Sequence, residues 1–83
     1  MNSSQTFDDQ ETLAQIGRLV KSHRLQKGWT QLDLAVALEN HRTQIARIER
    51  GEQDVRICTL SRIAQVLEIP LDVLIGHINS QSE

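Results

Sequence analysis

The segment from residue 30 to residue 51, TQLDLAVALENHRTQIARIERG, limits the fold more than any other part of the chain. Apolar residues recur at helical spacing in both of its halves: Leu34, Ala35, Leu38, Ile45 and Ile48. Only a short polar interval near 39–41 separates the two halves. The pattern therefore predicts a helix, a tight turn and a second helix.

The ends of this unit carry their own signals. Thr30 is a good N-cap residue, and Asp33 stands three residues later, where a capping box has its second member. Gly51 is typical of the residue that follows the last turn of a helix. These residues predict where the unit begins and ends.

Polar side chains fall on the side of the second helix opposite its apolar residues. They are Arg42, Thr43, Gln44, Arg47 and Arg50. Such side chains supply the donors that read base edges in the major groove of DNA. Exposed helices also carry Arg and Gln for solubility, so this segment alone favours neither interpretation.

The remaining sequence predicts an all-α domain of five short helices. The chain has 83 residues, with one Phe and one Trp, so one small core of aliphatic side chains is expected. Helices are predicted from about residue 9 to 26, over 57–67, and from Pro70 onward. We expect a disordered tail over 1–10, the domain over 11–78 and a polar tail over 79–83.

Charge is unevenly distributed along the chain. The whole chain has a formal net charge of −2, which argues against a general polyanion binder. Residues 16–50 hold seven bases and three acids, a net charge of +4 around the predicted two-helix unit. The acidic residues gather before and after this segment.

Several classes of protein receive no support from the sequence. No apolar run reaches the length of a membrane span or follows the pattern of a secretory signal, so a cytoplasmic protein is expected. The single cysteine and scattered histidines predict neither a metal site nor a cofactor. Since no nucleophile stands with a base, we do not expect an enzyme.

The spaced residues together resemble the Cro/phage-repressor (XRE) helix-turn-helix family over about residues 16–76. The resemblance rests on Arg24, residues 27–31 (KGWTQ), Leu34-Ala35, residues 45–51 (IARIERG), Leu60, Ile63-Ala64, Leu71-Asp72 and Leu74. It implies a five-helix, lambda-repressor-like domain that binds palindromic operator DNA as a dimer.

The same resemblance implies roles for single residues. Gln31 would touch a phosphate or a base from the start of the first helix of the unit. Arg42, Thr43 and Arg47 would face base edges, with Gln44 at the margin. Arg24 and Glu49 would form a partly buried ion pair that ties the first helix of the chain to the recognition helix.

Three departures from the family pattern are informative. Glu39 stands where the family commonly has Gly, so the turn is expected to hold a side chain at positive φ. His41 replaces the usual Ser or Asp N-cap, and Asn40 is the alternative cap. The loop after Gly51 carries two acids, Glu52 and Asp54, which weakens the expected phosphate contact there.

Leu32 and Val36 occupy positions that are usually polar in the family. We expect them to pack on the acidic N-terminal segment. The alternative is a patch for a protein partner.

The sequence therefore predicts a DNA-binding transcriptional regulator that acts as a homodimer. One recognition helix covers few base pairs, so specific affinity needs two half-sites. The expected dimer contact consists of Ile57, Cys58, Val73 and Ile75. The alternative function is a protein-interaction module, such as an antitoxin-type partner binder, that keeps the fold with weak or no DNA binding.

Overall fold

In the computed structural model, residues 6–7, 10–70 and 72–74 are described. They form four complete helices and one pair of short strands. The elements are β1 (Thr6–Phe7), α1 (Gln10–Gln26), α2 (Gln31–Leu38), α3 (Arg42–Glu49), β2 (Val55–Arg56) and α4 (Ile57–Leu67).

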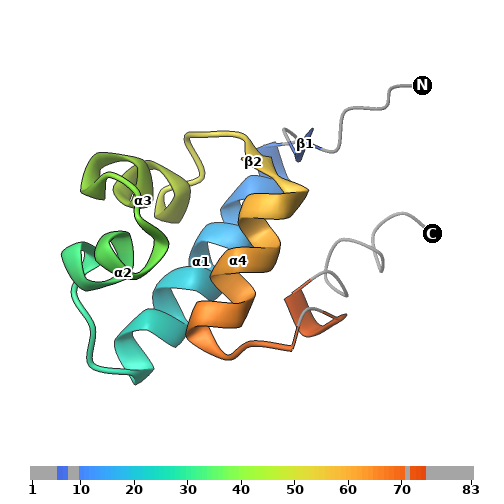
Figure 1. Ribbon diagram of the computed structural model, residues 1–83. Coiled ribbons are helices and arrows are strands. Elements are labelled where there is room, and N and C mark those ends of the chain that lie inside the picture. The colour runs from blue at the N-terminus through green and yellow to red at the C-terminus, as the bar shows by residue number, and fades with distance from the viewer. Residues whose placement is uncertain (1–5, 8–9, 71, 75–83) are drawn as a thin grey trace.

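The long helices α1 and α4 lie side by side, and the two short helices α2 and α3 pack together on one side of them (Figure 1). α3 contacts both α1 and α2. The most completely buried large side chains come from all four helices, from β2 and from the segment after α4: Ile16, Val20, Leu34, Ile45, Val55, Leu60, Ile63 and Leu74. One aliphatic core therefore holds the helix-turn-helix against the rest of the chain.

The fifth helix is described in its first turn. The backbone N–H groups of Val73 and Leu74 both donate to the carbonyl of Pro70, at 2.9 and 3.2 Å. Pro70 starts the turn, as predicted, because its own nitrogen has no proton to leave unpaired. Leu74 closes over the core, and the predicted all-α, five-helix fold is confirmed.

The N-terminal segment differs from its prediction at two residues. Thr6 and Phe7 form an antiparallel pair with Arg56 and Val55, within the stretch expected to be disordered. Two residues carry no periodicity to detect, and their partners lie almost fifty residues later in the chain. Gln10 already belongs to α1, and the remaining residues of both predicted tails lie outside the described ranges.

Among the described residues, none of the helices combines the length and the apolar character that crossing a membrane requires.

Candidate nucleic-acid interface

The start of α2 is fixed by a complete capping box. The Thr30 hydroxyl accepts a hydrogen bond from the Asp33 N–H at 3.0 Å, and the Thr30 N–H donates to the Asp33 carboxylate at 2.8 Å. The predicted reciprocal contact is confirmed, although Asp is shorter than the usual Glu or Gln. Two N–H groups at the helix end are satisfied, so α2 begins at a defined residue.

The turn between α2 and α3 holds a non-glycine residue in the left-handed conformation. Glu39 has φ 55° and ψ 47°, as predicted for the family's Gly position. The N–H groups of Glu39 and Asn40 donate to the carbonyls of Val36 and Ala35, at 3.1 and 2.9 Å. This bond pair closes the helix end and offsets part of the strain of the Glu39 backbone.

A side chain from α4 also holds this turn, and sequence reasoning missed it. The guanidinium of Arg62 donates to the carbonyl of Leu38 at 3.0 Å. The last carbonyls of a helix have no partner within the helix. Arg62 satisfies one of them and ties the turn to the core helices.

His41 occupies the N-cap position of α3. Its side chain makes no capping hydrogen bond, and the Asn40 side-chain oxygen accepts from the His41 N–H at 2.7 Å. Asn40 therefore stabilises the turn but does not become the cap, so α3 begins at Arg42.

The two sides of α3 have opposite environments. Ile45, Ile48 and Glu49 are buried. The residues predicted for DNA contact lie elsewhere on the helix surface: Arg42, Thr43, Arg47 and Arg50 are exposed, and Gln44 is half-buried. The helix therefore offers a row of long polar side chains to solvent while its inner side is fixed.

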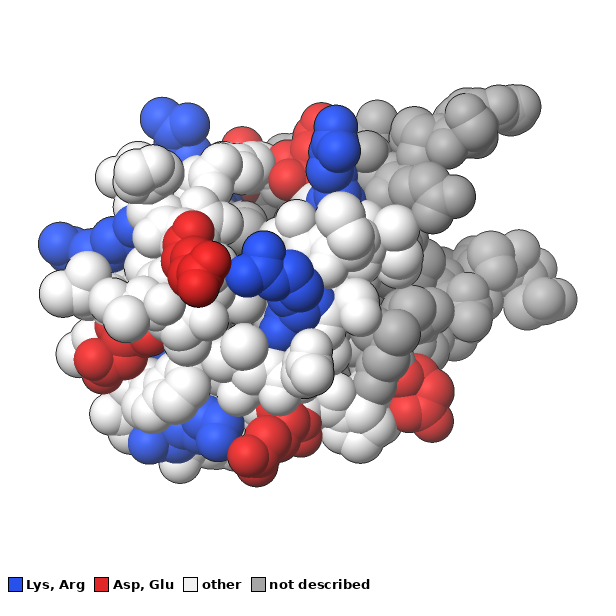
Figure 2. All heavy atoms as spheres, in the orientation of Figure 1, with Lys and Arg blue, Asp and Glu red and all other residues white. Residues whose placement is uncertain are grey.

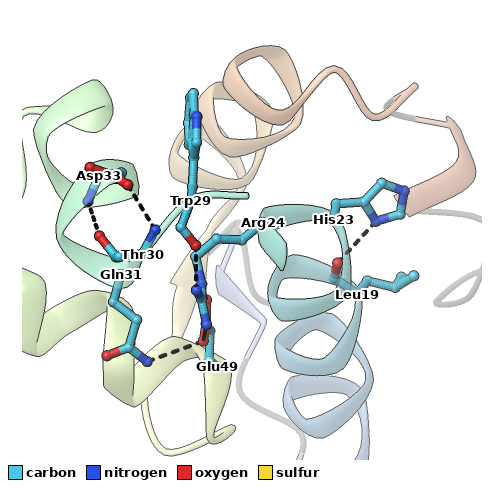
Figure 3. A network of polar contacts seen from close by, with 8 residues as sticks. All are labelled: Leu19, His23, Arg24, Trp29, Thr30, Gln31, Asp33 and Glu49. Carbon is cyan, nitrogen blue, oxygen red and sulfur yellow. Dashed lines mark hydrogen bonds and ion pairs between the residues drawn. The ribbon is translucent and has the colours of Figure 1, made fainter. Parts of the chain in front are cut away.

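The inner side is anchored by the ion pair that the family resemblance implied. Nε of Arg24 donates to Oε2 of Glu49 at 2.6 Å, and Nη2 donates to Oε1 at 3.0 Å (Figure 3). Only 7% of the Arg24 side chain and 3% of the Glu49 side chain are exposed. Because this geometry is bidentate, it fixes both the distance and the orientation between α1 and α3.

Two further hydrogen bonds complete the network around this pair. The Arg24 guanidinium donates to the carbonyl of Trp29 at 2.8 Å, and the Gln31 amide donates to Glu49 at 3.1 Å (Figure 3). The network therefore joins α1, the connection before α2, the first residue of α2 and the last residue of α3. Gln31, predicted to contact DNA, is directed here toward the protein.

Hydrogen bonding to Glu49 raises the pKa of Arg24 above its ordinary value, although burial acts in the opposite direction. A base with a raised pKa contributes stability at every pH below its unfolded value and loses it only as the pH rises through the folded value. The ordinary pKa of arginine already lies far above neutrality. The contribution of Arg24 to folding stability therefore does not change near neutral pH.

Gly17 allows the close approach of α1 and α3, and this role was not predicted from the sequence. A Cβ atom at this position would stand 2.5 Å from the carbonyl oxygen of Glu49 and 2.6 Å from that of Ile48. α1 therefore touches the backbone of α3, and no larger residue fits without displacing it. One signal was available, a glycine inside an apolar helical pattern.

A surface hollow runs along the second half of α3. It is bounded by Gln44, Arg47 and Ile48 of α3, by Asn40, by residues 52–54 and by Arg56 and Thr59. The predicted readers Gln44 and Arg47 therefore share one concave surface with two acids, Glu52 and Asp54. On the face drawn in Figure 2, basic and acidic side chains are interspersed.

Three of the four residues predicted for the dimer contact lie within the described ranges. Cys58 and Val73 are exposed and Ile57 is half-buried, while Ile75 lies outside the described residues.

Leu32 and Val36 are 56% and 68% exposed, so the expected packing on the N-terminal segment is wrong. The described part of that segment pairs with β2 instead.

His23 is half-buried in α1, and its Nδ1 forms a hydrogen bond with the carbonyl of Leu19 at 3.0 Å. Within the described ranges, no cluster of three His, Cys, Asp or Glu side chains is arranged to hold a metal ion.

Comparisons with known proteins agree with this geometry. A family model described as Helix-turn-helix matches residues 20–74. The "ImmF control region 10 kDa protein" of Bacillus phage phi105 is 39% identical over 59 residues, which covers 71% of this chain and 66% of that protein. The chain thus spans slightly less than two thirds of this phage relative.

Solved structures extend the similarity to three dimensions. The restriction-modification controller protein C.AhdI from Aeromonas hydrophila matches with a TM-score of 0.72 and 26% identity, over 77% of this chain and 97% of that chain. Wild-type C.Esp1396I, another such controller, matches with a TM-score of 0.74 and 32% identity, over 87% and 95%. A C.Esp1396I tetramer bound to its natural 35 base-pair operator matches with a TM-score of 0.73 and 32% identity, over the same shares.

Proposed function

This chain belongs to the Cro/phage-repressor-like helix-turn-helix family, and we propose that it is a sequence-specific DNA-binding transcriptional regulator. It acts as a homodimer on a palindromic operator. The structural relatives include controller proteins, one of them in complex with its operator. The phage relative is named for a control region.

One observation carries the proposal. α3 is fixed on its inner side by a buried bidentate ion pair and presents arginines on its outer side. Reading base edges requires side chains held within hydrogen-bond reach by a rigid support.

We assign the outer residues of α3 to different parts of the DNA. Arg42 and Arg47 lie one and a half turns apart, so they reach neighbouring base pairs in one major groove, where arginine favours guanine. Thr43 contacts a base edge or a phosphate, with Gln44 beside it at the hollow. Gln31 serves chiefly to orient Glu49, since its amide is already committed to that carboxylate.

The dimer brings two recognition helices onto one face of the duplex. The exposed Cys58 and Val73 and the half-buried Ile57 are apolar side chains outside the helix-turn-helix. A two-fold axis through them would make the contact isologous. It would separate the helices by roughly 34 Å, one turn of DNA. Because this patch is small, binding to the operator would strengthen the dimer by mass action.

The protein works in the cytoplasm and has no catalytic activity of its own. The second candidate function is a protein-interaction module, and the exposed apolar side chains of Leu32 and Val36 favour it. In that case the fold would present α2 to a protein partner, and duplex DNA would bind weakly or not at all.

Salt dependence separates the two functions. For the regulator, we expect the logarithm of the affinity for duplex DNA to fall linearly with the logarithm of the salt concentration, with a slope near −0.9 for each phosphate neutralised. Fluorescence anisotropy with a labelled duplex would measure it. Affinity that is undetectable at low salt would contradict the regulator and support the interaction module.

A further inference from the structure

The residues just after the recognition helix form a rigid turn that holds an acid beside Arg50. The N–H of Gly51 donates to the carbonyl of Ile48 at 3.0 Å, and the N–H of Glu52 donates to that of Arg47 at 2.9 Å. Gly51 has φ +72°, and a Cβ there would stand 3.1 Å from the backbone of Ala14. These two hydrogen bonds form a Schellman motif, and its glycine packs directly against α1.

The fixed turn sets Glu52 against Arg50. Nε of Arg50 lies 3.1 Å from Oε1 of Glu52, and both side chains are more than half exposed, at 57% and 56%. Since the backbone on both sides of the pair is hydrogen-bonded, the two side chains meet without ordering a loose loop. The contact therefore joins two exposed side chains that extend from ordered backbone at the end of α3.

Folding stability does not explain why an acid stands at this position. A carboxylate near the C-terminal end of a helix is repelled by the helix dipole, and an exposed ion pair recovers little. Glu52 also lines the hollow that contains the predicted base-reading residues Gln44 and Arg47. Its charge acts on the surface where DNA is expected to bind.

A negative charge there opposes the sequence-independent part of DNA binding. Non-specific affinity comes almost entirely from bases that neutralise phosphates. An arginine already paired with a carboxylate releases fewer counterions when it approaches a phosphate. A non-operator duplex offers phosphate contacts alone, so its affinity depends on how freely Arg50 leaves Glu52. At an operator, base contacts from Arg42 and Arg47 already hold α3 in the groove, so the complex depends less on a phosphate contact from Arg50.

We propose that Glu52 is a specificity-determining residue, which restrains Arg50 and lowers the affinity for non-operator DNA more than the affinity for the operator. This inference rests on the proposed DNA-binding function. It explains how a regulator with a net charge of −2 can carry a basic recognition segment without losing discrimination.

The test compares Glu52→Gln with Glu68→Gln. Both variants remove one negative charge and break one ion pair of an exposed glutamate, since Glu68 pairs with Lys27 at 3.7 Å at the end of α4. Affinities are measured for an operator selected from random duplexes and for a scrambled duplex of the same length, across a salt series.

Glu52→Gln should raise the affinity for the scrambled duplex by roughly three- to fivefold at low salt and steepen its salt slope by about 0.9. The operator affinity should rise less, so the ratio of the two affinities falls. Glu68→Gln should leave this ratio near the wild-type value. Adding Arg50→Ala to Glu52→Gln should cancel the gain on the scrambled duplex.

Equal changes for both duplexes, or equal behaviour of the two glutamine variants, would overturn the assignment of Glu52 while leaving the regulator function intact. A wild-type protein that selects no duplex at all would instead contradict the proposed function, and the inference with it.

Discussion

The inner and outer sides of α3 differ in almost every physical respect, although they belong to the same eight residues. Inside, Glu49 is held by three hydrogen bonds from Arg24 and Gln31, and the helix backbone touches Gly17. Outside, Arg42, Thr43 and Arg47 are exposed. The inner side fixes the position of the helix, and the side chains of the outer side can adjust to the ligand. Substitutions on the two sides of α3 should therefore have different effects, and those on the inner side should cost the most stability.

Replacing Glu49 by Ala should have the largest effect on folding. The change leaves the Arg24 guanidinium buried without its carboxylate, which typically costs about 3–5 kcal/mol of unfolding free energy. Chemical denaturation followed by circular dichroism would measure it. An unchanged midpoint would show that the inner side does not depend on the ion pair.

Replacing Gly17 by Ala should come next. The added methyl group would collide with two carbonyl oxygens of α3, and overpacking of this kind costs about 1–3 kcal/mol. Ala ordinarily favours a helix interior over Gly, so propensity alone predicts the opposite sign. A variant more stable than the wild type would therefore contradict the close approach of α1 and α3.

Replacing Arg47 by Ala should affect DNA reading and leave the fold intact. The unfolding free energy should stay within about 0.5 kcal/mol, because the side chain is exposed. Discrimination at one symmetric pair of operator positions should fall by about 1–3 kcal/mol. Competition with single-substituted operators measures this, and uniform weakening of all sequences would identify Arg47 as a phosphate contact.

Replacing Val73 by Asp should leave each subunit folded, because the side chain is 46% exposed. It should separate the dimer, since a desolvated carboxylate would face its own copy. Sedimentation velocity of Val73→Asp beside Val36→Asp would decide the position of the interface. If only the Val36 variant is monomeric, the contact lies on α2 instead.

The sequence was sufficient to predict the helices, the capping box and the Arg24–Glu49 pair. Helical periodicity and end signals are local, and the pair followed from a family pattern that spans both residues. The left-handed Glu39 was also predictable, because a turn of fixed geometry demands that conformation from whichever residue occupies it.

Contacts that depend on how the helices pack could not be predicted from the sequence. Nothing in the pattern around Arg62 indicates that its side chain would reach the carbonyl of Leu38 at the end of α2. In the sequence Gln31 is simply an amide at a helix start, and only the packing of α3 reveals Glu49 as its acceptor. The pairing of β1 with β2 joins segments too short to show any period.

Selection of bound sequences from a random duplex library tests the central claim most directly. The wild-type protein should enrich a two-fold symmetric site whose half-site centres are separated by about 10 base pairs. The Arg47→Ala protein, selected in parallel, should lose preference at one symmetric pair of positions and retain the others. Enrichment of no sequence by the wild-type protein, or of a site without two-fold symmetry, would contradict a dimeric regulator that reads DNA with the outer side of α3.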